Sequence, residues 1–402
     1  MPSLEPQNAR MKFTANKQLT TQALKLLQWN CRGIRSKLPQ LQAISADFDI
    51  ICLQESLLHN SSNFTLRGFN LIRQDITEPG QCGVCVFVRN NLVFNILDLS
   101  NSIFNDNSVE ILGVELFSER ESICIISIYR HPNCDTPMQF YDSLMGYITA
   151  RGNCVLMGDF NAHHSHWGCS TSDRAGNRIL AACENASICI LSDLRPSLLL
   201  PPSSGHSVID LILITPNIAP LCEVSTEIDT WSSDHFPIRV EVGINPSQRK
   251  RFAYKLNLNN QELKNFAVAL DDSFASFAKD LPPDSREAYS SLSEHKIIKT
   301  AVSCSSCPHK KASPGTVVIK SEKVAPPWWS NKCQEAVDAR REAAKTWQSN
   351  PLVENFYAYK RERAKCSKIL YREKRKSWRT FVGTFNCKTP TTTLWSLVKA
   401  FK

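Results

Sequence analysis

Short apolar runs alternate with polar turns between residues 24 and 242. The runs are rich in Ile, Val and Leu and too short for typical helices, so they predict β-strands. The expected strands are residues 24–29, 50–54, 83–88, 109–116, 122–129, 154–157, 188–191, 208–214 and 236–242. Helical spacing predicts helices at residues 38–47, 137–150 and 177–185, the second with Thr136 as its cap. Strands and helices mixed at this density predict an α/β fold, a two-sheet sandwich flanked by helices.

The pattern changes after this region. We expect a flexible N-terminus over residues 1–22, a sandwich domain over 23–245, and a linker with weak helices over 246–325. Residues 326–402 read as a helical basic extension, with two long helices on either side of a break near Asn350 and Pro351. Residues 331–380 carry 14 Lys and Arg against 6 Asp and Glu, so this one segment holds nearly all of the net charge of +9.

Composition narrows the class of protein. No run of 18 apolar residues occurs, which predicts a chain that does not cross a membrane. The N-terminus lacks the apolar core of a secretory signal. Most of the 16 cysteines sit inside apolar runs, as buried free thiols do in a reducing compartment. We therefore expect a nuclear and/or cytoplasmic protein that is not secreted.

Polar side chains recur where the predicted strands begin or end. In VLMGDFN, Asp159 and Asn161 are two residues apart, so in an extended segment they share one face. One such ending is an ordinary turn, but several in one α/β domain indicate a site, because ligand groups gather at strand ends. The other members of the set are Asn30, Glu55, Tyr129, Ser207, Asp210, Asp234 and His235.

The chemistry of this set is coherent. Its four carboxylates are hard oxygen ligands of the kind that Mg²⁺ prefers. The two asparagines can orient a water or a phosphate oxygen, and His235 can donate to a phosphate if a carboxylate supports its charge. A metal held by carboxylates, a positioned water and donors aimed at developing negative charge predict a phosphodiesterase.

Six motifs in this order resemble the endonuclease/exonuclease/phosphatase superfamily, which includes apurinic/apyrimidinic endonucleases and pancreatic-type deoxyribonuclease. They are WN, QE, the Tyr of SIYRHP, GDFN, SVID and SDH, between residues 24 and 243. Downstream, PPWWSNKC, the basic helices and KTPTTTLWSLVKAFK resemble the connector of jockey-like non-LTR retrotransposon polyproteins. A reverse transcriptase follows in those elements, whereas this chain stops at Lys402, so we expect a fragment or truncated copy.

The resemblance implies a metal site and a catalytic group. Glu55 would be the main ligand of Mg²⁺, or of Mn²⁺ as the alternative ion, with Asn30 and Asp234 beside it. The catalytic residues would be Asp159, Asn161, Asp210, His235 and Tyr129. Asp159 would position or deprotonate the attacking water, and Asn161 would hold that water or a phosphate oxygen. His235, oriented by Asp210, would donate to the scissile phosphate, and Tyr129 would support the phosphate or the leaving oxygen.

Three further residues are candidates for contact with nucleic acid. Arg32 stands where the repair enzymes carry an acid, and a guanidinium cannot ligate a metal, so a DNA phosphate is its expected partner. Arg174 precedes a predicted helix and would face DNA, although a plain helix cap explains the Asp173–Arg174 pair equally well. Ser207 would contact DNA or only bond backbone. Residues 195–206 are the candidate loop for probing the minor groove, with packing on the sheet as the alternative.

These observations predict a Mg²⁺-dependent DNA endonuclease that nicks target DNA. The 3′-hydroxyl would prime reverse transcription in a retroelement. The expected partner is double-stranded DNA, with the element RNA on the basic segment; packing against a polymerase domain is the alternative for that segment. Other functions are an abasic-site repair endonuclease, a phosphatase of inositol phosphates or sphingolipids, and a non-catalytic nucleic-acid-binding remnant. Zinc sites at His163–Cys169 and at Cys304 and Cys307 are weaker alternatives.

Overall fold

The computed structural model describes residues 23–118, 121–248 and 326–383, together with residues 252–253, 268 and 315–316. Nearly all of the expected linker, the N-terminal segment 1–22 and the residues after 383 lie outside the described residues, and so do Cys304 and Cys307. A short pair of strands, β13 (Phe252–Ala253) and β14 (Gly315–Thr316), belongs to a separate unit over residues 250–320.

The first sheet has six strands in the order β11-β12-β1-β2-β4-β3. Only β1 and β2 run parallel within it; the other neighbours are antiparallel. The strands are β1 (Leu24–Asn30), β2 (Ile50–Gln54), β3 (Phe69–Gln74), β4 (Val84–Arg89), β11 (Cys222–Thr226) and β12 (Ile238–Val242).

The second sheet also has six strands, in the order β5-β6-β7-β8-β10-β9, with β7 and β8 parallel. The strands are β5 (Phe94–Ile96), β6 (Val109–Phe117), β7 (Ser122–Arg130), β8 (Cys154–Asp159), β9 (Cys189–Leu191) and β10 (Asp210–Ile214). Every predicted strand is present. The strands β3, β5 and β11 were not predicted, because they lie at sheet edges and are largely half-exposed, so their apolar pattern is weak.

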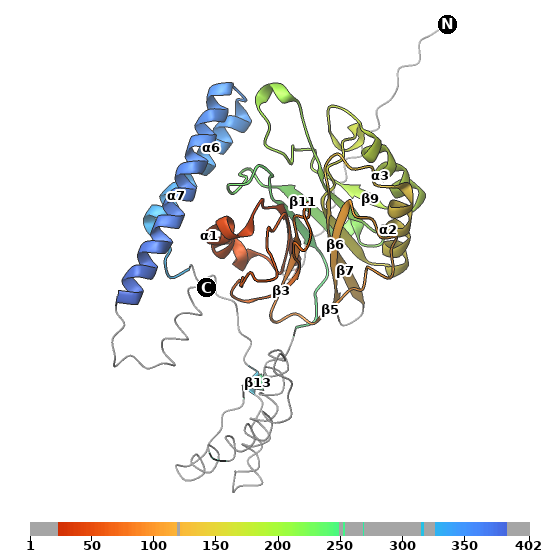
Figure 1. The fold of residues 1–402 in the computed structure, drawn as a ribbon, viewed down its shortest axis with the longest axis horizontal. Coiled ribbons are helices and arrows are strands. Elements are labelled where there is room, and N and C mark those ends of the chain that lie inside the picture. The colour runs from red at the N-terminus through yellow and green to blue at the C-terminus, as the bar shows by residue number, and fades with distance from the viewer. Residues whose placement is uncertain are drawn as a thin grey trace. The chain divides into compact units, whose positions relative to one another are not determined.

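Three helices flank the sandwich: α1 (Ile34–Ile44), α2 (Met138–Arg151) and α3 (Arg174–Asn185) (Figure 1). Short 3₁₀ turns cover Ser45–Asp47, Ser165–Trp167, Pro202–Ser204 and Ala219–Leu221. The expectation that Thr136 caps the second helix was wrong. Pro137 is the cap residue, and the buried Thr136 hydroxyl instead accepts a hydrogen bond from Arg130 Nε at 2.9 Å.

Apolar side chains form three layers around the sheets. The layer between the two sheets includes Leu26, Val86, Ile125, Met157 and Ile212. A second layer joins the second sheet to α2 and α3, and a third joins the first sheet to α1. Each large side chain buried in this way contributes about 1.5–3 kcal/mol. The predicted fold class, a two-sheet α/β sandwich with flanking helices, is therefore confirmed.

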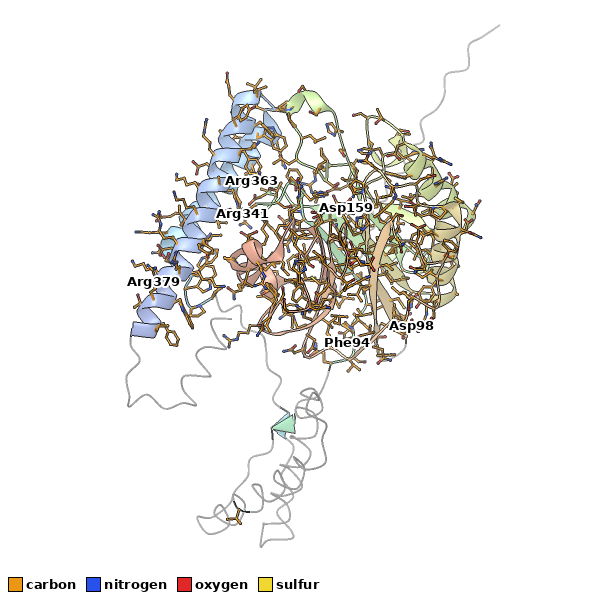
Figure 2. All side chains as sticks on the ribbon, viewed as in Figure 1. Phe94, Asp98, Asp159, Arg341, Arg363 and Arg379 are labelled. Carbon is orange, nitrogen blue, oxygen red and sulfur yellow. The ribbon has the colours of Figure 1, made fainter. Side chains whose placement is uncertain are left out.

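The basic segment folds as two helices, α6 (Asn331–Ser349) and α7 (Val353–Gly383), which lie side by side as a helical hairpin (Figure 1). The helical hairpin packs against the sandwich domain: Ala344, Phe356 and Tyr359 share an apolar cluster with Leu199 and Phe236. Figure 2 labels Asp159 within the sandwich and Arg363 on α7. Within the described residues, no helix combines the length and apolarity needed to cross a bilayer.

Candidate active site

Strand register brings the predicted site residues to one edge of the sandwich. The parallel pair β1 and β2 places Asn30 beside Gln54, so Glu55 follows at the same end. In the second sheet, Asp159 of β8 pairs with Tyr129 of the parallel strand β7. It also pairs with Asp210 of the antiparallel strand β10. Polar groups that are far apart in sequence therefore converge because their strands end, or begin, at the same edge.

The buried amide of Asn30 connects the two sheets. Its Nδ2 donates to Glu55 Oε1 at 2.9 Å and to Asp159 Oδ2 at 2.8 Å, while its Oδ1 accepts from the Arg32 backbone N–H at 3.2 Å. The amide nitrogen thus faces both carboxylates. This arrangement holds the Glu55 and Asp159 carboxylates at a fixed separation across the two sheets.

Glu55 and Asp234 share one cation. The Arg32 guanidinium forms a hydrogen-bonded ion pair with Asp234, and its Nε lies 3.6 Å from Glu55 Oε2. The Asp234 carboxylate raises the pKa of Arg32 above its usual value. Tyr129 donates its hydroxyl to Glu55 Oε1 at 3.2 Å, and burial, reinforced by the Glu55 charge, raises the pKa of Tyr129. Tyr129 is therefore a protonated donor at neutral pH.

His235 lies between two buried carboxylates. Its Nδ1 is 2.8 Å from Asp210 Oδ2 and its Nε2 is 3.8 Å from Asp159 Oδ2, and the exposed fractions of all three residues are 5% or less. Burial alone favours neutral imidazole, but the Asp210 and Asp159 charges outweigh it and raise the pKa of His235. Burial likewise raises the pKa of Asp159, although the His235 charge opposes this. The site thus holds a charged imidazole next to a carboxyl group of unusually high proton affinity.

Backbone conformation fixes the strand-end residues. Arg32, Glu55 and Asn161 have φ values of 43°, 49° and 44°, in the left-handed region that costs a non-glycine residue about 1–3 kcal/mol. Contacts hold Asn161 there: its N–H donates to Asp159 Oδ1 at 3.0 Å, and its Nδ2 donates to Arg130 O at 2.7 Å. Gly158 is required just before, because a Cβ there would lie 1.8 Å from the Ile128 carbonyl oxygen.

The loop of residues 229–236, which carries Asp234 and His235, is held on its sandwich side by β1. Trp29 Nε1 donates to His235 O at 3.2 Å, and Ser233 Oγ donates to Asn30 O at 2.8 Å. Residues of the 195–206 loop also contact it, since the Phe236 N–H donates to Ser197 O at 2.7 Å. The loop therefore has little freedom on this side.

The helical hairpin holds the other side of the 229–236 loop. Arg340 Nε donates to Asp229 Oδ2 at 2.7 Å, and both side chains are essentially excluded from solvent. The Tyr359 hydroxyl donates to Asp229 Oδ1 at 3.0 Å and accepts from the Thr230 N–H at 2.9 Å. The Trp347 ring stacks between Phe236 and Tyr359, with centroid distances of 6.2 and 6.0 Å. Arg340, Trp347 and Tyr359 each follow His235 by more than 100 residues, and they help to place it.

The three predicted nucleic-acid contacts lie in different environments. The Arg32 side chain is 58% exposed but engaged with the carboxylates described above. Arg174 is exposed at the start of α3 and pairs with Asp135 at 3.2 Å. Ser207 is buried, and its Oγ lies 3.2 Å from His163 Nε2, whose Nδ1 is 3.2 Å from Asp173. Their roles toward DNA stay predictions.

The structure explains several polar residues for which the sequence left alternatives open. Asp173 caps α3 by accepting from the Gly176 N–H at 2.7 Å, as the cap interpretation expected. In the 195–206 loop, Ser197 and Leu199 are buried, whereas residues 201–206 are exposed. Two groups in the described part of the chain have metal-like spacing, and neither includes His164 or His166. One is Asp159, Asp210 and His235; in the other, Glu110 already accepts from the Cys82 and Gly83 N–H groups at 2.7 Å.

Sequence reasoning missed several buried polar residues that support the site. Gln28 Nε2 donates to Asp210 Oδ1 at 2.9 Å and to Gln54 Oε1 at 3.0 Å, which fixes the orientation of the Asp210 carboxylate. Ser197 Oγ accepts from the Asp210 N–H at 3.0 Å. Gln28 could have been found, because it is polar inside an apolar run and shares a strand face with Asn30. No local signal distinguishes Ser197 from any loop serine.

The residues present fit a divalent metal. Glu55 and Asp234 come from different strand ends, yet their carboxylates converge on the same positive group, Arg32. Carboxylate oxygens at this place match the ligand preference of Mg²⁺ and Mn²⁺.

Two stacked mixed sheets bring buried carboxylates and a histidine together at their strand ends, as the sequence resemblance predicts. Residues 123–239 match the family Exo_endo_phos_2, described as "Endonuclease-reverse transcriptase". This match confirms the resemblance to the endonuclease/exonuclease/phosphatase superfamily over residues 123–239, which are less than a third of the chain.

Two transposon proteins of Drosophila melanogaster are homologous to the chain. The probable RNA-directed DNA polymerase from transposon BS is 25% identical over 241 residues, which cover 56% of this chain and 25% of that protein. The corresponding protein from transposon X-element is 22% identical over 222 residues, covering 54% and 24%. The match thus spans about a quarter of these relatives' length. The endonuclease domain of TRAS1, a telomere-specific non-LTR retrotransposon, aligns with a TM-score of 0.45 at 18% identity, over 56% of this chain and 99% of that one.

Proposed function

We propose that this chain is a divalent-metal-dependent endonuclease that nicks double-stranded DNA. The observation that carries the proposal is the buried Asp159–His235–Asp210 group next to the Glu55 and Asp234 carboxylates. It combines a proton acceptor, a charged donor and a metal-binding pair within one edge of the sandwich. Phosphodiester hydrolysis needs these three functions.

The residues divide the reaction between them. Glu55 and Asp234, with Asn30 beside them, would hold Mg²⁺ or Mn²⁺, which supplies Lewis-acid polarisation of a phosphoryl oxygen. Asp159 orients the attacking water and takes its proton, because burial raises the proton affinity of its carboxyl group. Asn161 holds that water or a phosphate oxygen in line. His235, kept charged by Asp210, donates to the phosphate as negative charge develops on it.

The products follow from which bond breaks. The water oxygen bonds to phosphorus and the bond between phosphorus and the 3′ oxygen breaks, so the nick carries a 3′-hydroxyl and a 5′-phosphate. Tyr129, held protonated by burial, supports the leaving oxygen or the phosphate. A 3′-hydroxyl is the end that a polymerase extends. We therefore propose that the nick serves target-primed reverse transcription, which the homology to transposon polymerases supports. We propose that the protein acts in the nucleus and/or cytoplasm.

A plasmid nicking assay tests the proposal. Supercoiled plasmid incubated with the full chain and Mg²⁺ should relax to open circles, EDTA should stop the reaction, and a template-dependent polymerase should extend the nicks. Absence of nicking with Mg²⁺ and with Mn²⁺ would contradict the proposal. Cleavage of duplexes bearing an abasic site, without cleavage of intact plasmid, would instead identify a repair-type endonuclease.

A further inference from the structure

The helical hairpin uses one face of α7 to dock on the sandwich domain. On this inner face the Tyr359 hydroxyl and the Arg363 guanidinium bond to the 229–236 loop, and Cys366 and Leu370 are buried against α6 and Trp328. These positions follow one another at spacings of three and four residues, which keeps them on one side of an α-helix. The side of α7 turned away from both the sandwich and α6 is consequently exposed.

Basic residues form a continuous stripe on that outer face. Two residues correspond to 200° around a helix, so a residue two positions after an inner-face residue points to the opposite side. Each of the first four members of the stripe stands at such a position. The stripe consists of Arg361, Lys365, Lys368, Arg372, Arg375 and Arg379, all exposed. It extends over about 27 Å at 1.5 Å per residue. Figure 2 labels Arg363 and Arg379, which mark two levels along α7.

Little negative charge balances the stripe. Residues 363–383 contain eight Lys and Arg and one acid, Glu373, whose Oε2 accepts from Ser330. Lys365 pairs with Glu362 at 3.4 Å. Among the residues that the structure describes, the other five stripe residues form no ion pair with a carboxylate. A row of uncompensated cations on a rigid helix attracts a polyanion through its phosphates.

Aromatic side chains border the stripe. Tyr371 is 63% exposed, and Trp378, which contacts Phe381, is 38% exposed. They stand two helical turns apart and therefore lie on the same margin of the stripe. Exposed rings beside cations provide stacking surfaces for bases, and only a single strand presents unstacked bases to them. A duplex would use the cations but leave the rings unused.

We propose that the outer face of α7 binds single-stranded nucleic acid, and that this site is separate from the endonuclease site. The separation follows from geometry, because inner-face residues contact the 229–236 loop while the stripe points to the opposite side of the helix. The chain would then hold a single strand and nick a duplex at the same time. The inference does not depend on the proposed nuclease activity.

Binding measurements on the full chain in EDTA test the inference. Labelled unstructured RNA, single-stranded DNA of equivalent sequence and duplex DNA are titrated by fluorescence anisotropy over a salt series. The stripe variant is Arg372→Gln/Arg375→Gln/Arg379→Gln. The control, Lys332→Gln/Lys345→Gln/Arg67→Gln, removes the same charge from exposed positions elsewhere. A Tyr371→Ala variant tests stacking.

The stripe variant should bind single strands about tenfold or more weakly, and the slope of log K against log salt should fall by about 2, at roughly 0.7 per phosphate contact. Tyr371→Ala should weaken single-strand binding about fivefold or more, because a stacked base contributes about 1–3 kcal/mol. The control should bind as the wild type does, and both triple variants should nick plasmid normally. Comparing the RNA and DNA arms identifies which strand type the site prefers.

Three results would overturn the inference. Equal losses in the stripe and control variants would mean that only net charge matters. A larger loss for duplex than for either single strand would assign the stripe to duplex DNA. Failure of the wild type to bind either single strand would leave an acidic protein as the partner. Since plasmid nicking is measured separately, none of these results bears on the endonuclease proposal.

Discussion

Arg340 in α6 and Asp229 in the 229–236 loop form a buried ion pair with a distance of 2.7 Å between Nε and Oδ2. Only four residues lie between Asp229 and Asp234, so the ion pair fixes the loop that carries the proposed metal ligand and His235. Gln40 in α1 also accepts from the Arg340 guanidinium, at 3.0 Å. The helical hairpin is therefore bound to the sandwich at the edge that carries the candidate site.

Removing the Arg340 charge should destabilise the protein and impair nicking. Arg340→Met leaves the Asp229 carboxylate buried without its cation, a change that costs about 3–5 kcal/mol. Urea unfolding should show this loss, and Arg340→Met/Asp229→Asn should recover part of it. The matched control, Lys332→Met, lies exposed on the same helix and should change little. Wild-type stability in Arg340→Met would mean that the helical hairpin is not docked in solution.

Asp159→Asn should abolish nicking while duplex binding persists. The amide cannot take a proton from the attacking water, and loss of a general base costs about 10² to 10⁴ in rate. Single-turnover nicking and anisotropy on the same preparation separate the two effects. Asp142→Asn, exposed on α2, is the control. Activity of Asp159→Asn within a few-fold of the wild type would remove Asp159 from the role of base.

Glu55→Gln should raise the Mg²⁺ concentration needed for half-maximal nicking, because one anionic ligand becomes neutral. The amide keeps the size of the side chain and can still accept from Asn30 and Tyr129. Glu78→Gln, in an exposed turn, should leave the midpoint unchanged. An unchanged midpoint for Glu55→Gln as well would show that Glu55 is not a ligand.

Arg32→Gln should lower the Mg²⁺ midpoint. The guanidinium pairs with both Glu55 and Asp234, so it competes with a metal for these carboxylates. A Mg²⁺ titration of nicking checks the shift, and Arg35→Gln, exposed on α1, is the control. If Arg32 instead binds a DNA phosphate, the substitution should raise the KM for DNA and leave the Mg²⁺ midpoint where it is.

The sequence by itself determined the strands that matter to the site and the residues at their ends. Apolar runs mark buried strands locally, and in VLMGDFN the polar residues follow the run directly, so Asp159 and Asn161 were visible without a fold. The basic character of α6 and α7 was equally local. The strands β3 and β11 were missed because edge strands bury few side chains and leave a weak pattern.

Only the tertiary structure decided which distant groups meet. Arg32 pairs with Asp234 across 202 residues, and Gln28 orients Asp210 across 182. Arg340 reaches Asp229 across 111 residues. Such contacts depend on sheet register and on how helices dock, which no periodicity along the chain records. The basic stripe of α7 is another example. The sequence shows many Lys and Arg residues there, but only the docking of the inner face of α7 shows that the stripe on its outer face is exposed.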